Sequence, residues 1–205
     1  MAKFRICANP ARGAWKLFAV LVVAVGLTGC AGTFGEVKPL AGGAGVTSAG
    51  KPGQGATKLI LGEIKIADAR IEKIEGEVFA RSLRKGIIEW SLAHHAFQSV
   101  SELAPDTLLA PGSLVLNATI TEVEKGSLAL RLLVGMGAGQ SRLVGDFRFS
   151  DESGKNLGGF TARRSYLGGA GAGGGDVISI EELFVRLGEE VAESTQKWVN
   201  GEKFE

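Results

Sequence analysis

Residue types that build most catalytic and metal sites are scarce in this sequence. Its 205 residues include two cysteines, two histidines and one tyrosine. The histidines, His94 and His95, are adjacent, so on a helix their side chains point about 100° apart and cannot chelate one ion together. We interpret His94 as a packed residue on an apolar helix stripe. No serine has an obvious histidine partner, so the sequence predicts a non-enzymatic protein without a metal or cofactor.

Long apolar runs and an excess of basic residues are missing as well. The longest apolar run, residues 17–27, is about half the roughly 20 residues that a membrane-crossing helix needs. Four basic residues and no acidic residue precede it, and small residues follow, which is the pattern of a secretory signal peptide over residues 1–29. Its removal leaves 19 basic against 22 acidic residues, a net charge of −3, which argues against nucleic-acid binding.

The end of the signal peptide and the cysteine that follows it read "LTGC" (27–30), which resembles the bacterial lipobox, a leucine and two small residues before a cysteine. The resemblance implies cleavage between Gly29 and Cys30 and acylation of the Cys30 thiol. Because Cys7 is removed with the signal, the mature chain then has no thiol for a disulfide or a thiolate metal site. The lipid is therefore the one covalent group that we expect.

The residue after the cysteine influences in which membrane a lipoprotein of Gram-negative cells resides. In Gram-negative cells an aspartate there tends to retain a lipoprotein at the inner membrane, and here the position is Ala31. We expect membrane attachment through the acyl chains and, in a source with two membranes, an outer-membrane location facing the periplasm. A source with one membrane would place the domain outside the cell.

Composition divides the remaining chain in two. Residues 30–56 consist mainly of Gly, Ala, Ser, Thr and Pro, which cannot bury enough apolar surface to offset the ordering entropy, so we expect a flexible tether. Residues 57–205 carry periodic hydrophobic patterns and have the size of one domain.

Hydrophobic periodicity predicts the elements of this domain. Apolar residues at steps of three and four from Phe79 to Phe97 indicate one helix, in which Gly86 costs about 1 kcal/mol relative to alanine. A second helix begins behind a capping box of Ser179 and Glu182. The predicted strands cover residues 58–66, 97–103, 114–120, 128–134, 143–149 and 156–166. We therefore expect an α+β fold: a mixed, largely antiparallel sheet of about five or six strands with two helices on one face.

Two glycine-rich stretches raise the alternative of a nucleotide-binding loop. The first carries Gly135, Gly137 and Gly139 between two alternating segments, where no helix begins, so we interpret these glycines as structural, marking a bend or hairpin. The second, residues 168–176, contains a G-x-G-x-x-G pattern. No βαβ unit follows it, and a surface loop is the simpler interpretation.

Basic residues on the predicted strands form the remaining candidate site. Arg131, Arg142 and Arg148 alternate with apolar residues and define a candidate anion-binding patch for glycan or lipid. The alternative is the solvated outer face of an amphipathic sheet. Asp68 and the acidic residues that follow it we interpret as solvated charge.

The order of these motifs resembles a known family. A lipobox, a tether, "RLLVGMGAGQSRL", "DESGKNLGGF", a glycine-rich gap and a C-terminal helix resemble an uncharacterised bacterial lipoprotein domain of unknown function. That domain has a mid-domain G-x-G-x-G-x-S stretch, here ending at Ser141, and a later glycine-lysine turn, here Ser153-Gly154-Lys155 with serine in place of the usual threonine. The resemblance covers about residues 58–200. More distantly, the chain resembles small envelope lipoproteins that include the curli-secretion pore subunit.

The resemblance implies a location and a fold rather than an activity. We expect a lipid-anchored, non-enzymatic envelope protein that binds another envelope protein or a glycan. The alternatives are a self-assembling structural or secretion-related subunit, hence a homo-oligomer, and a nucleotide-binding protein that uses a glycine-rich loop.

Overall fold

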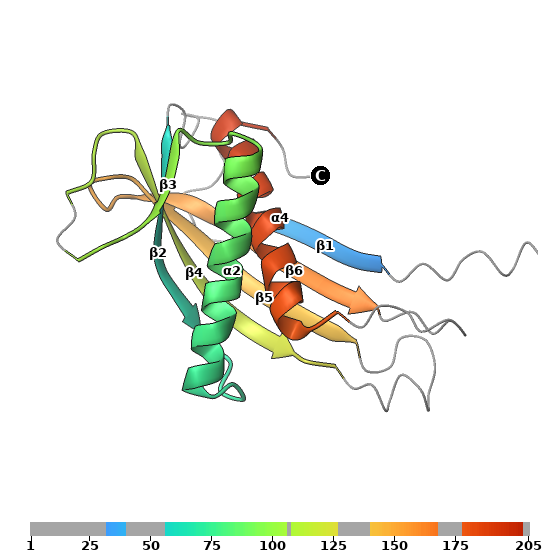
Figure 1. Cartoon of the computed structure of the whole chain (residues 1–205). Coiled ribbons are helices and arrows are strands. Elements are labelled where there is room, and N and C mark those ends of the chain that lie inside the picture. The colour runs from blue at the N-terminus through green and yellow to red at the C-terminus, as the bar shows by residue number, and fades with distance from the viewer. Residues whose placement is uncertain (1–31, 40–55, 106–107, 127–139, 168–177, 203–205) are drawn as a thin grey trace, which may run out of the picture.

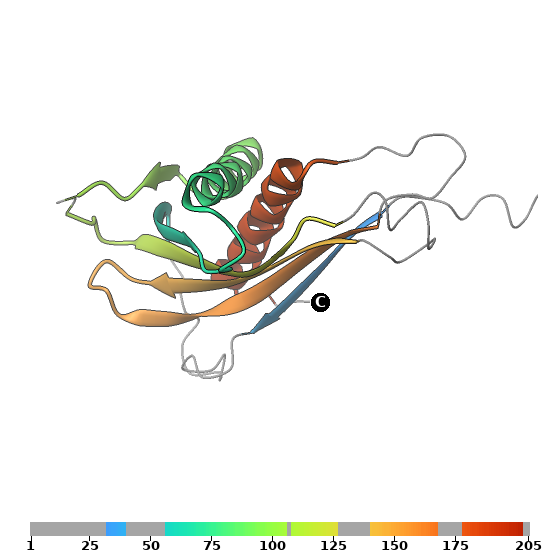
Figure 2. The same cartoon turned by 90° about the horizontal axis from the view of Figure 1, so that it is seen from below.

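A computed structural model describes residues 32–39, 56–105, 108–126, 140–167 and 178–202. Within these residues six strands form one open sheet, and two helices cover one of its faces (Figures 1 and 2). The helices are α2 (Lys73–Ala93) and α4 (Ile180–Asn200). The strands are β1 (Gly32–Pro39), β2 (Lys58–Ile66), β3 (Ser99–Glu102), β4 (Ser113–Glu124), β5 (Ser141–Ser150) and β6 (Asn156–Leu167). The predicted α+β fold is confirmed.

The sheet is mixed, with strand order β1-β6-β5-β4-β2-β3. Strand β2 pairs in parallel with both β3 and β4. The other three pairings, β4 with β5, β5 with β6 and β6 with β1, are antiparallel. Helix α2 supplies the long connection that a parallel pairing requires after β2.

The alternating patterns of β4 and β5 direct one face of each strand into the core. Leu114, Leu116, Ala118 and Ile120 of β4 are all buried and belong to the core beneath the helices. In β5 the buried residues are Leu143, Gly145, Phe147 and Phe149. The residues between them, such as Arg142 and Arg148, lie on the opposite, outer face of the sheet, because successive side chains of a strand alternate between faces.

Three register shifts interrupt the pairing of the sheet, and two of them are β-bulges in β2 and β4 near the helix-covered core. One lies in β2 between Leu61 and Ile64, and the other in β4 between Ile120 and Glu122. At the first bulge the backbone N–H of Glu63 donates to the side-chain oxygen of Asn117 at 2.9 Å. The extra residue returns Ile64 and then Ile66 to the helix-covered face, where both pack against the core.

The two helices cross at a pair of glycines. A Cβ built on Gly86 would overlap the backbone carbonyl oxygen of Val185 and lie 2.9 Å from its carbonyl carbon, and one built on Gly188 would lie 2.9 Å from the amide nitrogen of Ile87. The close approach lets Phe79 stack on Phe184 with ring centroids 4.7 Å apart. Gly86 therefore lowers helix propensity but permits the contact between α2 and α4.

Half of the predicted capping box is present at the start of α4. The Ser179 hydroxyl accepts a hydrogen bond from the N–H of Glu182 at 3.1 Å. The Glu182 carboxylate instead accepts from Arg186 at 3.0 Å. The helix ends at Gly201, whose φ of 74° is the left-handed cap that glycine adopts without strain.

Strand β1 corrects part of the sequence interpretation, because Gly32–Pro39 lies inside the predicted tether. It pairs with β6 along its whole length, and Val37 packs against the core. Backbone pairing and one apolar side chain thus hold a segment whose composition indicates a coil. The division at residues 56 and 57 stays a prediction, and residues 40–55 lie outside the described part.

His94 also differs from expectation. It is the C-terminal cap of α2 and is exposed, with its ring stacked on Trp90 at a centroid distance of 4.2 Å, rather than packed in the core. Helix α2 ends there, before the predicted stripe reaches Phe97. Cys30, Gly135, Gly137 and Gly139 all lie outside the described residues, as do the predicted strand 128–134 and the glycine tract 168–176.

Candidate functional site

Strand β2 is covered along only part of its length on the side away from β4. Strand β3 pairs with residues 58–61, whereas β4 follows β2 on its other side to Ile66. Among the described residues, no strand lies beside 62–66 on the β3 side. This half of β2 is an open sheet edge, which can accept a further strand.

The open edge presents backbone groups for pairing. The N–H of Ala67 donates to the carbonyl oxygen of Ile120 in β4 at 2.8 Å. Because the backbone groups of successive residues point to opposite sides of a strand, those of Lys65 also face β4. The N–H and C=O groups of Ile64 and Ile66 therefore face the open side.

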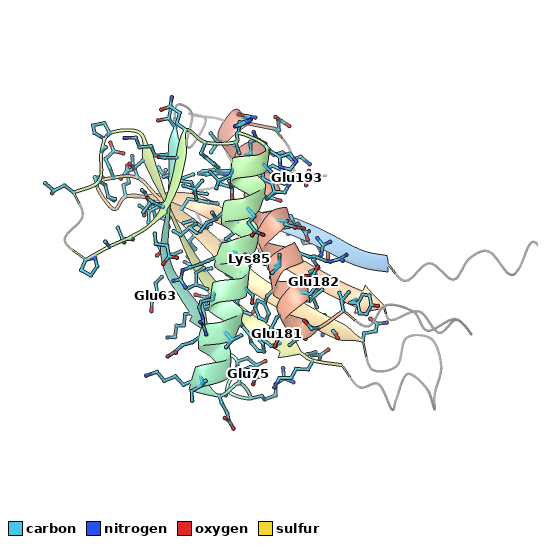
Figure 3. The ribbon with its side chains drawn as sticks, viewed as in Figure 1. Glu63, Glu75, Lys85, Glu181, Glu182 and Glu193 are labelled. Atoms are coloured by element: carbon cyan, nitrogen blue, oxygen red, sulfur yellow. The ribbon has the colours of Figure 1, made fainter. Side chains whose placement is uncertain are left out.

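A groove of about 930 Å³ follows this edge, between β2 and the first half of α2. Its apolar surface comes from Ile64, Ile66 and Ile71, and the small residues Gly76 and Ala80 of α2 lie on the wall opposite. Charges of both signs surround it: Glu63, Lys65, Glu72, Lys73, Glu77 and Arg81. Figure 3 shows Glu63 at this edge of the sheet, beside β2, and Glu75 near the start of α2.

Arg84 lies where β3 ends and the groove begins. Its guanidinium donates to the carbonyl oxygen of Gly62 at 3.4 Å, and its Nε lies 3.7 Å from the carboxylate of Glu102. Leu103 then donates its N–H to the carbonyl oxygen of Leu61 at 2.8 Å. These contacts hold the end of β3 beside Leu61 and Gly62, the point after which no described strand pairs with β2 on this side.

Asp68 holds the other end of the groove. Its carboxylate accepts hydrogen bonds from Arg70 Nη2 at 2.6 Å, from Arg70 Nε at 2.9 Å and from the N–H of Val123 at 2.8 Å. The hydrogen bonds from Arg70 hold the pKa of Asp68 well below its usual range, although burial acts in the opposite direction. Asp68 is buried, so its interpretation as solvated charge is wrong: it ties the chain after β2 to the bulged end of β4.

The candidate anion-binding patch is spread along the outer face of the sheet. Arg142 lies 2.5 Å from the carboxylate of Glu122 and 3.7 Å from that of Glu124, so two acidic groups balance its charge. Arg148 is exposed six residues further along β5, which corresponds to about 20 Å in an extended strand. Arg131 lies outside the described residues, and the patch stays a prediction.

A largely buried ion pair joins β6 to α4. Arg164 of β6 contacts Glu190 of α4 at 2.8 Å, and both side chains are largely buried. Burial raises the pKa of Glu190, and the bond from Arg164 partly offsets this. A Cβ at Gly35 would overlap the Glu190 carboxylate, so glycine lets β1 lie over the pair.

The described residues contain no cluster of three or more His, Cys, Asp or Glu side chains that could hold a metal ion. No helix among them is long and apolar enough to cross a membrane. Sequence reasoning missed the groove, because it depends on where β3 stops and on the β2 bulge. The small residues Gly76 and Ala80, four positions apart on one face of α2, are a local signal of it.

The family described as a domain of unknown function, DUF4410, matches residues 68–170. The chain belongs to this family. The match contains α2 and strands β3 to β6, and it confirms the domain-of-unknown-function resemblance inferred from the motifs. A search of curated proteins finds no match.

Among the solved structures that are similar to this chain are two from different organisms. The PelC dodecamer from Paraburkholderia phytofirmans is 14% identical, with a TM-score of 0.46, over 80% of this chain and 98% of that chain. A putative lipoprotein from Caulobacter crescentus CB15 is 16% identical, with a TM-score of 0.31, over 68% of this chain and 92% of that chain.

Proposed function

We propose that the protein is a lipid-anchored, non-enzymatic envelope component that binds an extended polypeptide segment at the groove beside β2. The observation that carries the proposal is the open edge at residues 62–66, where β4 pairs on one side only. The lipobox ending at Cys30 supports the anchor. The resulting molecule has a fixed end at the membrane and a binding edge on its domain.

The geometry of the groove suits strand addition. A bound segment would pair its backbone with the N–H and C=O groups of Ile64 and Ile66, which gives affinity without requiring a particular sequence. Its alternate side chains would enter the groove and contact the apolar side chains of Ile64 and Ile66. The charges around the groove would select among segments by sign.

Binding at the groove can be tested with a photoreactive amino acid in place of Glu77, an exposed residue of α2 that lines the groove. The matched control places the same probe at Glu152, exposed in the turn between β5 and β6. Irradiation of cells should yield a defined adduct from position 77 and none from position 152. Equal labelling at both positions, or none at 77, would contradict the groove as the binding site.

The anchor is tested by Cys30→Ala. Only the thiol of that cysteine can take the diacylglyceryl group, so the variant should lose label from a palmitate analogue and leave the membrane fraction or remain unprocessed. In a source with two membranes, wild type should sediment with the outer membrane in a sucrose gradient. Label retained on Cys30→Ala would refute the lipid anchor, and sedimentation of wild type with the inner membrane would refute the assigned location.

A further inference from the structure

We infer that the open edge of β2 binds strand β1 of a second copy of this chain, in one antiparallel register. The inference rests on the proposed function, because it names the occupant of the same groove. It begins from a short sequence similarity: glycine, glutamate, an aliphatic residue and lysine occur in this order at residues 35–38 and again at residues 62–65. The first copy of the pattern lies in β1 and the second in the open half of β2.

Strand β1 also has an open edge. It pairs with β6 on one side, and no described strand lies on its other side. The sheet thus ends in β1 at one edge and in the uncovered half of β2, beside the short β3, at the other (Figure 1). Two copies can therefore continue one sheet across their contact.

Antiparallel pairing of the two edges matches their charges in one register. With Val37 opposite Ile64, Glu36 lies opposite Lys65 and Lys38 opposite Glu63. A shift of two residues in one direction places Glu36 opposite Glu63, and a shift in the other direction places Lys38 opposite Lys65. Directly opposed like charges destabilise a strand pair, so these neighbouring registers are disfavoured.

In the same register, the apolar side chains of β1 and β2 lie on one face of the sheet and their charged side chains on the other. Glu36 pairs across the sheet with Arg163, on the outer face, whereas Val37 packs against the core. In β2, Ile64 is packed against the core, which puts Glu63 and Lys65 on the outer face. Val37 of the second copy would therefore enter the groove beside Ile64, and all four charges would lie on the outer face.

Backbone direction agrees as well. The backbone N–H of Ala67 faces β4, and the residue pairings from β4 through β5 and β6 then determine which backbone groups of β1 face β6. These are the groups of Glu36 and Lys38. The backbone groups of Gly35 and Val37 then face the open side of β1. They would pair with those of Ile66 and Ile64, which face the open side of β2.

The orientation of the strands fixes the type of assembly. From the pairings, β1 runs antiparallel to β2 within one copy. A second copy in the same orientation therefore meets β2 with an antiparallel β1, and the helices of both copies cover the same face. Such a head-to-tail contact uses two different edges, and repeated copies form a ring or a filament.

The contacts that β1 makes within its own copy permit this exchange. Glu36 lies 2.5 Å from Lys38 and 3.5 Å from Arg163, and all three side chains are substantially exposed. Exposed ion pairs of this kind contribute little to stability. Little stability is therefore lost when the side chains of Glu36 and Lys38 turn from these contacts toward the partner copy.

Disulfide trapping tests the register in the full-length protein, which is oxidised in the membrane before it is extracted. Two variants, Glu36→Cys and Lys65→Cys, are co-expressed and oxidised, and dimers are scored on non-reducing gels. We expect a covalent dimer only when both variants are present, and the same for Lys38→Cys with Glu63→Cys. Within one copy these positions lie at opposite edges of the sheet, so the bond must join two copies. Glu36→Cys with Glu152→Cys is the matched control and should stay monomeric.

Charge reversal gives a second readout that an unfolded variant could not imitate. Glu36→Lys should reduce the yield of the dimer trapped through Lys38→Cys and Glu63→Cys by several-fold, and Lys65→Glu on the other copy should restore it. Absence of dimer at both cysteine pairs would overturn the inference. If the probe at position 77 still forms an adduct with another protein, the proposed function stands and only its occupant is wrong; if it forms none, both fail.

Discussion

Replacing Gly86 by alanine separates helix propensity from helix packing. In an isolated helix this change is favourable by about 1 kcal/mol. In the folded protein the new methyl group would overlap the backbone of Val185 in α4, and backbone atoms cannot rotate away as a flexible side chain can. Overpacking of a core typically costs about 1–3 kcal/mol. Because the better helix propensity offsets part of this cost, we expect Gly86→Ala to lower the free energy of unfolding by up to about 2 kcal/mol.

The matched control is Gly76→Ala, in the same helix and also buried. A Cβ at Gly76 would lie 3.5 Å from the nearest atom, in the side chain of Ile66, which is an ordinary contact. Only the gain in helix propensity remains, so this variant should be more stable by up to about 1 kcal/mol.

Urea unfolding followed by circular dichroism measures both changes against wild type. In thermal unfolding the corresponding shift is about 2–4 °C per kcal/mol, downward for Gly86→Ala and upward for Gly76→Ala. The opposite signs are the diagnostic result. If Gly86→Ala equals or exceeds Gly76→Ala in stability, the close crossing of α2 and α4 at this glycine is wrong.

Two further predictions concern the ends of elements. Asp68→Asn should cost about 1–3 kcal/mol at pH 7, because the carboxylate loses charge-assisted hydrogen bonds from Arg70, a partner that is itself exposed. Since the folded-state pKa of Asp68 lies below its usual 3.8, its contribution is present above about pH 4 and is lost as the pH falls. Urea unfolding at several pH values should therefore show a weaker acid dependence in Asp68→Asn, and an unchanged profile would refute this. Gly201→Ala should cost about 1 kcal/mol, because alanine is strained at a φ of 74°, and an unchanged melting temperature would contradict the cap.

Elements with a strong internal period could be predicted from the sequence. The alternation in β4 and β5 depends only on which side chains must leave water, and the structure buries those residues. The two-helix, mixed-sheet arrangement follows from the order of such elements. Gly86 marked its position by breaking a helix pattern, although its partner on α4 could not be inferred from one segment alone.

Features that depend on contacts between distant segments could not be predicted. Strand β1 has one packed aliphatic residue, Val37, in a composition typical of coil, and only pairing with β6 orders it. The sequence around Asp68 is typical of a surface carboxylate. Only the fold brings the side chain of Arg70 and the N–H of Val123 within hydrogen-bond distance of it. The groove depends on three features from separate segments of the chain: the end of β3, the bulge at Glu63 and the small residues on α2.

Amide hydrogen exchange of Ile64 and Ile66 tests most directly whether the β2 edge is a binding edge. We expect fast exchange at these two amides in dilute, detergent-extracted protein, where the edge is open. At native density in the membrane, the occupied edge should slow both by at least about tenfold. The amides of Ala118 and Ile120 in β4, which has strands on both sides, should exchange slowly in both states. Equal exchange of Ile64 and Ile66 in the two states would contradict the account.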